Sequence, residues 1–248
     1  MSKIEIAIFT ATVAFVAAML AQLLSHNLTR RRENIKDKKI VVQELVLPVL
    51  NDVILYIDTE MDFRKGHDVE VEIDSKEIIR KISNNVKYGN SKLINAIFKY
   101  KQSVTFFDGR GGNERRQTYS VFYFFLDYAI DVLHRSDYTD EYLLDIIDKS
   151  QKLSGLAYLL MDLLGVEEAL RILSYKWQLT NEFWKEISND SLDIILSEKF
   201  SKHSNVEHIQ ISVLNALIGS FEKNGEESGT ELIKNLKSAV EVVEGRWQ

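Results

Sequence analysis

The pattern of hydrophobic and polar residues in this chain changes once, near residue 25. Residues 6–24 read IAIFTATVAFVAAMLAQLL and contain no charged side chain. At about 1.5 Å per residue, about 20 apolar residues span the roughly 30 Å hydrocarbon core of a bilayer. A surface helix of a soluble domain carries a polar stripe, which this segment lacks. The pattern predicts a single transmembrane helix, with residues 1–29 as a membrane anchor.

Two other interpretations of this segment stay open at the level of sequence. A secretory signal peptide has a shorter apolar region and a basic leader, but here Lys3 is offset by Glu5. The second alternative is a core helix buried inside the folded domain. We favour a membrane anchor that is not cleaved, because hydropathy over a window of this length is one of the more reliable sequence signals.

The orientation of the predicted span follows from the residues that come after it. Residues 30–39 (RRRENIKDKK) hold six basic and two acidic side chains, whereas the N-terminal flank is neutral. Basic flanks stay in the cytoplasm. We therefore expect the amino terminus outside the cell membrane, everything after Arg30 in the cytoplasm, and membrane lipid as a partner.

Small residues recur along one side of the predicted span. Their spacing alternates between four and three residues, at Ala7, Ala11, Ala14, Ala18 and Ala21. Small side chains let two transmembrane backbones approach closely enough for dispersion to hold them together. An alanine-rich span can show the same spacing by chance. The pattern thus suggests a homo-oligomer formed through this helix and leaves a monomeric span as the alternative.

After the span, apolar positions follow a helical period almost to the C-terminus. One proline and eleven glycines in 248 residues are few turn formers, which favours helices over strands. The sequence predicts an all-α chain in which the transmembrane helix precedes a cytoplasmic multi-helix bundle. We expect a basic collar and stalk helix over residues 30–66, kinked near Pro48 or ending near Leu47, and a cytoplasmic helical domain over residues 67–248.

Local signals predict where several of these helices begin and end. Asp74 should cap one helix, with Glu77 completing a capping box, and Gly89 should be the left-handed residue after its end. Asn90 or Ser91 should cap the next helix. Further helices are expected over residues 142–164, 166–179 with Trp177 on its apolar face, 183–189, 192–200 with Ser191 as its cap, 206–221 and 229–243.

The string YGNSKLINAIFKY, residues 88–100, resembles a signature of uncharacterised bacterial proteins. Those proteins have one N-terminal span, a basic collar and a cytoplasmic helical domain, and several lie in prophages or defence-type gene clusters. The likeness covers the anchor, the collar and this turn between helices, about the first hundred residues. The resemblance implies a membrane-tethered role in bacterial conflict with phage, and it carries over no catalytic residues.

Charge and cysteine content narrow the function classes. The net charge is −6, of which residues 30–39 contribute +4 and residues 40–248 contribute −10. An acidic body argues against sequence-independent nucleic-acid binding, so we expect no nucleic-acid partner. The absence of cysteine excludes disulfides, thiolate catalysis and cysteine-ligated zinc. We expect no metal and no cofactor.

One glycine-rich loop is a candidate anion site. Residues 106–117 (FFDGRGGNERRQ) could offer backbone amides and guanidinium groups to a phosphorylated ligand. The loop lacks the Lys-Ser/Thr pair of a phosphate-binding loop, so a solvated connector is the other interpretation. The candidate ligand-binding residues are Arg110, Gly111, Gly112, Arg115 and Arg116.

Residues 119–135 (YSVFYFFLDYAIDVLHR) should form the central core helix, with Ser120 at the start of a narrow polar stripe. Asp127, Asp131 and His134 continue that stripe and lie on one face, within reach of one metal ion or one proton relay. Helical di-metal proteins repeat a carboxylate-x-x-His unit on a second helix, and this chain has no second copy. A polar seam between helices is the alternative to a catalytic site.

These observations favour a membrane-tethered helical interaction or effector protein. Such a protein would act at the inner membrane face by oligomerisation or by binding an unidentified protein partner. The alternative is a metal- or phosphate-dependent enzyme that uses the stripe formed by Asp127, Asp131 and His134.

Overall fold

The structure is a computed structural model that describes residues 3–65, 67, 73–106, 112–136, 140–197, 205–224 and 229–245. For residues 3, 5–11, 205, 224 and 229 it describes the backbone alone. Within these ranges every regular element is helical, which confirms the predicted all-α fold.

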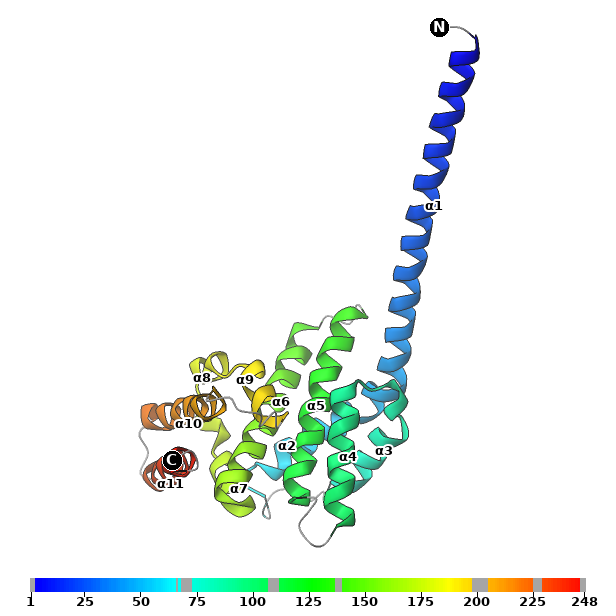
Figure 1. Cartoon of the computed structure of the whole chain (residues 1–248). Coiled ribbons are helices and arrows are strands. Elements are labelled where there is room, and N and C mark those ends of the chain that lie inside the picture. The colour runs from blue at the N-terminus through cyan, green and yellow to red at the C-terminus, as the bar shows by residue number, and fades with distance from the viewer. Residues whose placement is uncertain are drawn as a thin grey trace.

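The chain begins with one continuous helical path from Lys3 to Glu60. It consists of α1 (Lys3–Val41), a π-helical turn η1 (Val42–Val46) and α2 (Leu47–Glu60). Figure 1 shows α1 projecting away from the body of the protein, whereas α2 runs inside the body. The two helices therefore differ in direction, and η1 lies where the direction changes.

The kink predicted near Pro48 takes the form of this π-helical turn. The backbone N–H of Leu47 donates a hydrogen bond to the carbonyl of Val42, five residues back. A proline inside an α-helix lacks a donor, and its ring clashes with the carbonyl four residues earlier, here that of Glu44. The wider π turn relieves this clash. The helix does not end near Leu47, since α2 continues to Glu60.

The path enters the hydrophobic core at Val41, the last residue of α1. Val42 and Leu45 are fully buried, and the buried side chains of α2 belong to the same core cluster as the rest of the body. The last exposed apolar residue before this point is Ile40. Within the predicted collar and stalk, residues 30–66, the side chains before Val41 are therefore exposed or half-buried.

The remaining elements wrap around two long central helices. They are α3 (Ser75–Asn84), the 3-10 turn η2 (Val86–Tyr88), α4 (Ser91–Thr105), α5 (Glu114–Arg135), α6 (Glu141–Leu164), α7 (Val166–Leu173), the 3-10 turn η3 (Lys176–Gln178), α8 (Asn181–Glu186), α9 (Asn189–Leu196), α10 (Asn205–Asn224) and α11 (Gly229–Gly245). α5 packs against α4 and α6, and α6 also packs against α7 and α9 (Figure 1). α10 and α11 pack against each other at the C-terminal end.

α5 is the central core helix, as its composition predicts. Fourteen of its side chains are buried, and its aromatic residues point to several sides. Tyr119, Phe122, Tyr123 and Phe125 all have less than 2% exposure. The ring of Phe122 meets that of Tyr56 on α2 edge-on, with 5.3 Å between centroids. Large aromatic side chains that are enclosed in this way account for much of the apolar area that the fold buries.

Two of the predicted helix caps are confirmed. The Asp74 carboxylate accepts a 2.8 Å hydrogen bond from the amide two residues later, at the start of α3. The Asn90 side chain accepts a 2.9 Å bond from the amide three residues later, at the start of α4. Glu77 does not complete a capping box, because its carboxylate forms a bidentate pair with Arg80.

Three other local predictions are wrong. Gly89 has φ −79 and ψ 163, which is extended backbone, so glycine serves there for space rather than for a left-handed turn. A β-carbon on Gly89 would lie 3.2 Å from the side chain of Leu93. Ser188, not Ser191, caps α9. Trp177 is 57% exposed, because α7 ends before it and η3 changes the helical phase.

Candidate functional site

The polar stripe on α5 runs from the interior of the body to its surface. Ser120 is buried, with 2% exposure. The side chains of Asp127 and Asp131 are 36% and 40% exposed, and His134 is exposed. The helical period therefore predicts the stripe correctly, but its members lie in different environments.

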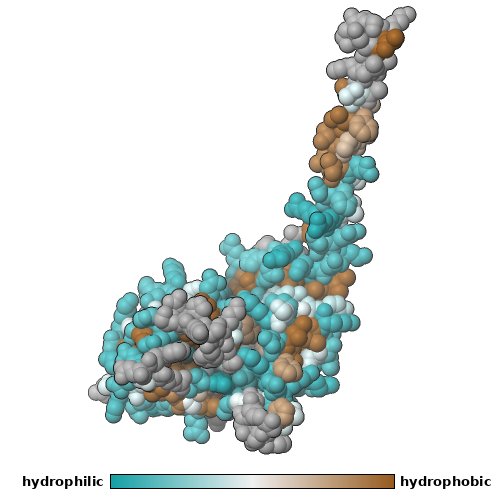
Figure 2. Space-filling model, viewed as in Figure 1, coloured by the Kyte–Doolittle hydropathy of each residue, from teal (hydrophilic) through white to brown (hydrophobic). Residues whose placement is uncertain are grey.

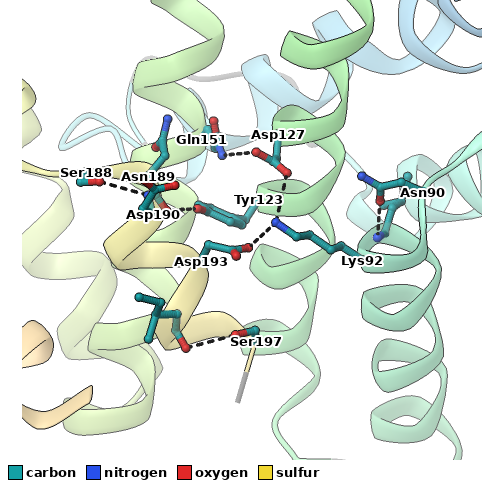
Figure 3. A network of polar contacts seen from close by, with 12 residues as sticks. Asn90, Lys92, Tyr123, Asp127, Gln151, Ser188, Asn189, Asp190, Asp193 and Ser197 are labelled. Atoms are coloured by element: carbon teal, nitrogen blue, oxygen red, sulfur yellow. Dashed lines mark hydrogen bonds and ion pairs between the residues drawn. The ribbon is translucent and has the colours of Figure 1, made fainter. Parts of the chain in front are cut away.

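Asp127 belongs to a network that joins four helices (Figure 3). Lys92 on α4 places its ammonium 3.0 Å from Asp193 on α9 and 4.0 Å from Asp127 on α5. The Gln151 side chain on α6 donates a 3.4 Å hydrogen bond to Asp127. One lysine is thus shared by two carboxylates from different helices.

A second series of polar contacts continues from this network. The Tyr123 hydroxyl donates a 2.8 Å hydrogen bond to the backbone carbonyl of Asn189, as Figure 3 shows. The Asn189 side chain donates a 2.7 Å bond to Asp148, and Asp148 pairs with Lys152 at 2.9 Å. Lys152 also donates to the backbone carbonyl of Trp184 at 2.8 Å. These contacts connect α5 and α6 to α8 and α9.

The electrostatics of the network favour a structural role. Burial raises the pKa of Asp127, while the nearby Lys92 opposes this effect. Burial alone would lower the pKa of Lys92, but its contacts with Asp193 and Asp127 raise the pKa overall. Burial likewise raises the pKa of Tyr123, so its hydroxyl stays protonated at neutral pH. The two carboxylates thus stabilise the charge of Lys92, whereas burial destabilises the charge of Asp127.

The structure does not bring the three candidate catalytic residues together on one ligand. Asp127 contacts Lys92 and Gln151, whereas Asp131 forms an ion pair with Arg135 at 2.7 Å, one turn further along α5. Among the described residues, no group of three histidine, aspartate or glutamate side chains is arranged to hold a metal ion.

The glycine-rich loop lies partly outside the described residues, which exclude Arg110 and Gly111. Gly112 has φ +73, a left-handed conformation that favours glycine. The loop leads into Asn113, which caps α5 by accepting a 3.0 Å bond from the amide of Arg116. Arg115 and Arg116 therefore lie in the first turn of a helix rather than in the loop.

These two arginines point to different neighbours. Arg115 pairs with Glu60 at the end of α2, and Arg116 pairs with Asp162 on α6. The Arg116 guanidinium also lies 5.2 Å from the centroid of the Tyr158 ring. Adjacent residues on a helix do not share a face. Each guanidinium thus contacts a carboxylate of the protein, and the two carboxylates come from different helices.

A hollow of about 740 Å³ lies between the end of α2 and the beginnings of α3 and α5. Two ion pairs border it, one between Arg115 and Glu60 and the other between Lys76 and Glu114 at 3.1 Å. Asp74 adds a third carboxylate to the lining. Three acidic and two basic side chains do not favour an anionic ligand.

Sequence reasoning missed the residues that organise this network: Lys92, Tyr123, Gln151 and Asp193. Lys92 and Asp193 are 101 residues apart, so no local spacing signals their contact. Gln151 has no sequence signal either, because it lies in a polar stretch, DKSQK, at residues 148–152.

The other prominent feature is the apolar surface of α1. Every described side chain from Thr12 to Leu24 is exposed, including Ala14, Ala18 and Ala21 of the predicted alanine seam. The side chains of Ala7 and Ala11 lie outside the described residues. Figure 2 shows the apolar part of α1 separated from the body by a hydrophilic section.

Within the described chain, one helix is long and apolar enough to cross a membrane, and it is this N-terminal one. Its most apolar window is 44% buried, so length and composition alone do not separate a span from a core helix. The buried side chains of this helical path begin at Val41, whereas those from Thr12 to Leu24 are all exposed.

A comparison of the chain with models of protein families, with curated proteins and with solved structures finds no match in any of the three.

Proposed function

We propose that this chain is a membrane-tethered helical interaction protein. In this proposal residues 1–29 cross the cell membrane and the helical body binds a partner at the cytoplasmic face. The observation that carries the proposal is the exposure of the apolar part of α1. Phe15, Leu20 and Leu24 are 66%, 56% and 63% exposed, and no element of the body covers them.

The energetics of this surface support a membrane environment. Burying one large apolar side chain contributes roughly 1.5–3 kcal/mol. The exposed set comprises Val13, Phe15, Val16, Met19, Leu20, Leu23, Leu24 and Leu28. Removing side chains of this number and size from water contributes on the order of 10 kcal/mol. Lipid supplies that burial for an isolated helix without any partner protein.

The orientation proposed is amino terminus outside and body inside. The collar over residues 30–39 supports it, because six basic side chains follow the apolar segment directly. The acidic body is compatible with the cytoplasm, and its lack of cysteine suits a reducing compartment.

A binding role fits the body better than catalysis does. Several of its charged side chains form ion pairs between helices, such as Lys92 with Asp193 and Arg116 with Asp162. The candidate catalytic residues Asp127 and Asp131 each contact a separate cation. The resemblance of residues 88–100 to proteins from prophage and defence-type gene clusters adds the proposal that the protein acts in phage exclusion, through a partner or through self-association.

The test is membrane partitioning of the full-length protein. We expect it to float with membranes and to resist alkaline extraction, and we expect a variant that lacks residues 2–26 to be extracted as a soluble protein. V16D/L20D should also release the protein, whereas I94D/F98D should not, although all four side chains have similar exposure of 47–57%. Extraction of the full-length chain as a soluble monomer would contradict the proposal.

Orientation can be measured separately, because the chain has no cysteine of its own. We expect an impermeant maleimide to label S2C in intact cells and to label Q248C only after lysis.

For the proposed role in exclusion, phage plating on cells that express the full-length chain should fall relative to cells that express the variant without residues 2–26. Equal plating of a broad phage panel on both would contradict that role.

A further inference from the structure

Six basic residues follow the apolar part of α1, and they are not equivalent. They are Arg30, Arg31, Arg32, Lys36, Lys38 and Lys39. Lys38 is half-buried, and its ammonium lies 5.8 Å from the centroid of the Tyr128 ring on α5. Ile35 is also half-buried. One side of this section of α1 therefore faces the body.

Arg32, Lys36 and Lys39 form a stripe that the body does not cover. Their spacing of four and three residues places them on one face of the helix. At roughly 100° and 1.5 Å per residue, the stripe is about 10 Å long, and Lys38 lies roughly 100° around the helix from Lys39. All three side chains are exposed. We call these three residues the cation stripe.

The charges of the cation stripe are not balanced within the described residues. No carboxylate lies within ion-pair distance of any of the three side chains there, although Glu33 and Asp37 are on the same helix. Among the described residues of the body, exposed cations without an ion pair also occur, for example Lys101, Lys185 and Lys234, so the alignment of three such cations on one helix face is what distinguishes the cation stripe. Three exposed cations in a row create a positive potential that attracts an anionic partner.

The position of the cation stripe selects that partner. Arg32 follows Leu24 by eight residues, which is about 12 Å along the helix, and Lys39 follows it by about 22 Å. The headgroup layer extends about 5–8 Å beyond the hydrocarbon core. The long side chain of Arg32 reaches back toward this layer, whereas Lys36 and Lys39 attract it over a longer distance that a tilt of the helix shortens. Transmembrane helices tilt by about 20° on average and by up to 40°, which brings one face of the section closer to the bilayer.

We propose that the cation stripe binds the headgroups of anionic phospholipids and tilts α1 toward the bilayer on that side. This inference rests on the proposed function, in which residues 1–29 span the membrane. The acidic body, with its charge of −10, is repelled by the same leaflet. Attraction at Arg32, Lys36 and Lys39 and repulsion of the body together fix how the body is held beneath the membrane.

The experiment measures how close the base of α1 lies to the bilayer. The full-length Q43C variant carries a fluorescent donor at an exposed position of η1, and it is reconstituted into vesicles with acceptor-labelled headgroups. The vesicles contain phosphatidylcholine alone or phosphatidylcholine with phosphatidylglycerol. We expect energy transfer to rise when phosphatidylglycerol is present and to fall back at high salt, because screening weakens the contact.

Two charge-matched variants identify the residues responsible. R32Q/K36Q/K39Q should lose the rise in energy transfer. K101Q/K185Q/K234Q removes the same number of charges from exposed lysines of the body and should keep it. No rise with the unsubstituted collar, or an equal rise in both triple variants, would overturn the inference.

Flotation of the same vesicles separates the two proposals. If the protein floats but its energy transfer does not depend on phosphatidylglycerol, the cation stripe does not bind anionic headgroups and the membrane anchor stands. If the protein does not float with vesicles of either composition, both the anchor and the inference are wrong.

Discussion

Gly155 of α6 lies so close to Leu192 of α9 that a β-carbon on the glycine would be 2.9 Å from the Cδ1 atom of Leu192. The same β-carbon would lie 3.2 Å from the ring of Tyr123 on α5. Three helices therefore meet at a point where α6 has room for a hydrogen atom only. α6 continues through Gly155 without a break.

Gly155→Val should lower the free energy of unfolding by about 2 kcal/mol, because overpacking a filled contact forces neighbouring side chains and backbone to move. The measurement is denaturant unfolding of the full-length protein in detergent, followed by tryptophan fluorescence. Gly219→Ala on α10 is the control, since its β-carbon would meet nothing within 4 Å. That variant should gain about 0.5–1 kcal/mol from helix propensity. Similar effects of both changes would contradict the packing argument.

Arg116→Ala should lower the free energy of unfolding by about 2 kcal/mol. It removes a partly buried cation from Asp162 and a guanidinium from the face of the Tyr158 ring. The matched control is Arg135→Ala, which breaks the exposed pair with Asp131 on the same helix and should cost less than about 0.5 kcal/mol. Calorimetric or denaturant unfolding distinguishes the two. A smaller loss for Arg116 than for Arg135 would show that burial does not set the strength of these pairs.

Lys152→Met should cost about 2 kcal/mol of unfolding free energy. The side chain is 11% exposed, and its removal takes a cation from Asp148 and a donor from the backbone carbonyl of the half-buried Trp184. Lys149→Met, three residues earlier, breaks an exposed pair with Asp145 and should change stability by less than about 0.5 kcal/mol. The same unfolding assay applies, and equal losses would argue against the network that joins α6 to α8.

The raised pKa of Asp127 predicts a dependence of stability on pH. Burial raises this pKa, so the folded state holds the Asp127 proton more tightly than the unfolded state does. Stability from this group is present below the ordinary pKa of an aspartate, about 3.9, and is lost as the pH rises through the raised value. The side chain of Asp127→Asn is a neutral amide that does not ionise in this pH range.

We therefore expect the stability of Asp127→Asn relative to the unsubstituted protein to increase from about pH 3.5 to neutral pH. Urea unfolding at a series of pH values measures this difference. Asp145→Asn, at an exposed position of α6, serves as the control and should show no such increase. A difference that stays constant would mean that the Lys92 contact offsets the burial of Asp127. A difference that decreases as the pH rises would mean that the Lys92 contact outweighs that burial.

Features that depend on one or two helical turns could be predicted from the sequence. Asp74 and Asn90 cap α3 and α4 because a side-chain oxygen reaches only the next amides along the chain. The burial of α5 also follows from its sequence, since most of its residues after Gln117 are apolar or aromatic. The helical period does not place Trp177 correctly, because α7 ends before it and η3 turns the residue to the surface.

Features that depend on distant segments could not be predicted in this way. The candidate site requires Lys92 and Asp193 to meet across 101 residues. Arg115 and Arg116 are neighbours in sequence, but the chain that folds around them supplies a carboxylate from α2 to one and from α6 to the other. Their charge predicts an anion site, and only the tertiary fold shows that each guanidinium contacts a protein carboxylate.

The uninterrupted helical path from Lys3 to Glu60 has a mechanical consequence. A flexible linker would isolate the body from movements of the anchor, but here the backbone hydrogen bonds continue through η1 into the centre of the core. Any twist or tilt imposed on the outer end acts as a torque on α2 and on the helices packed around it. A movement of the N-terminal end of α1 is therefore coupled to the packing of the helical body.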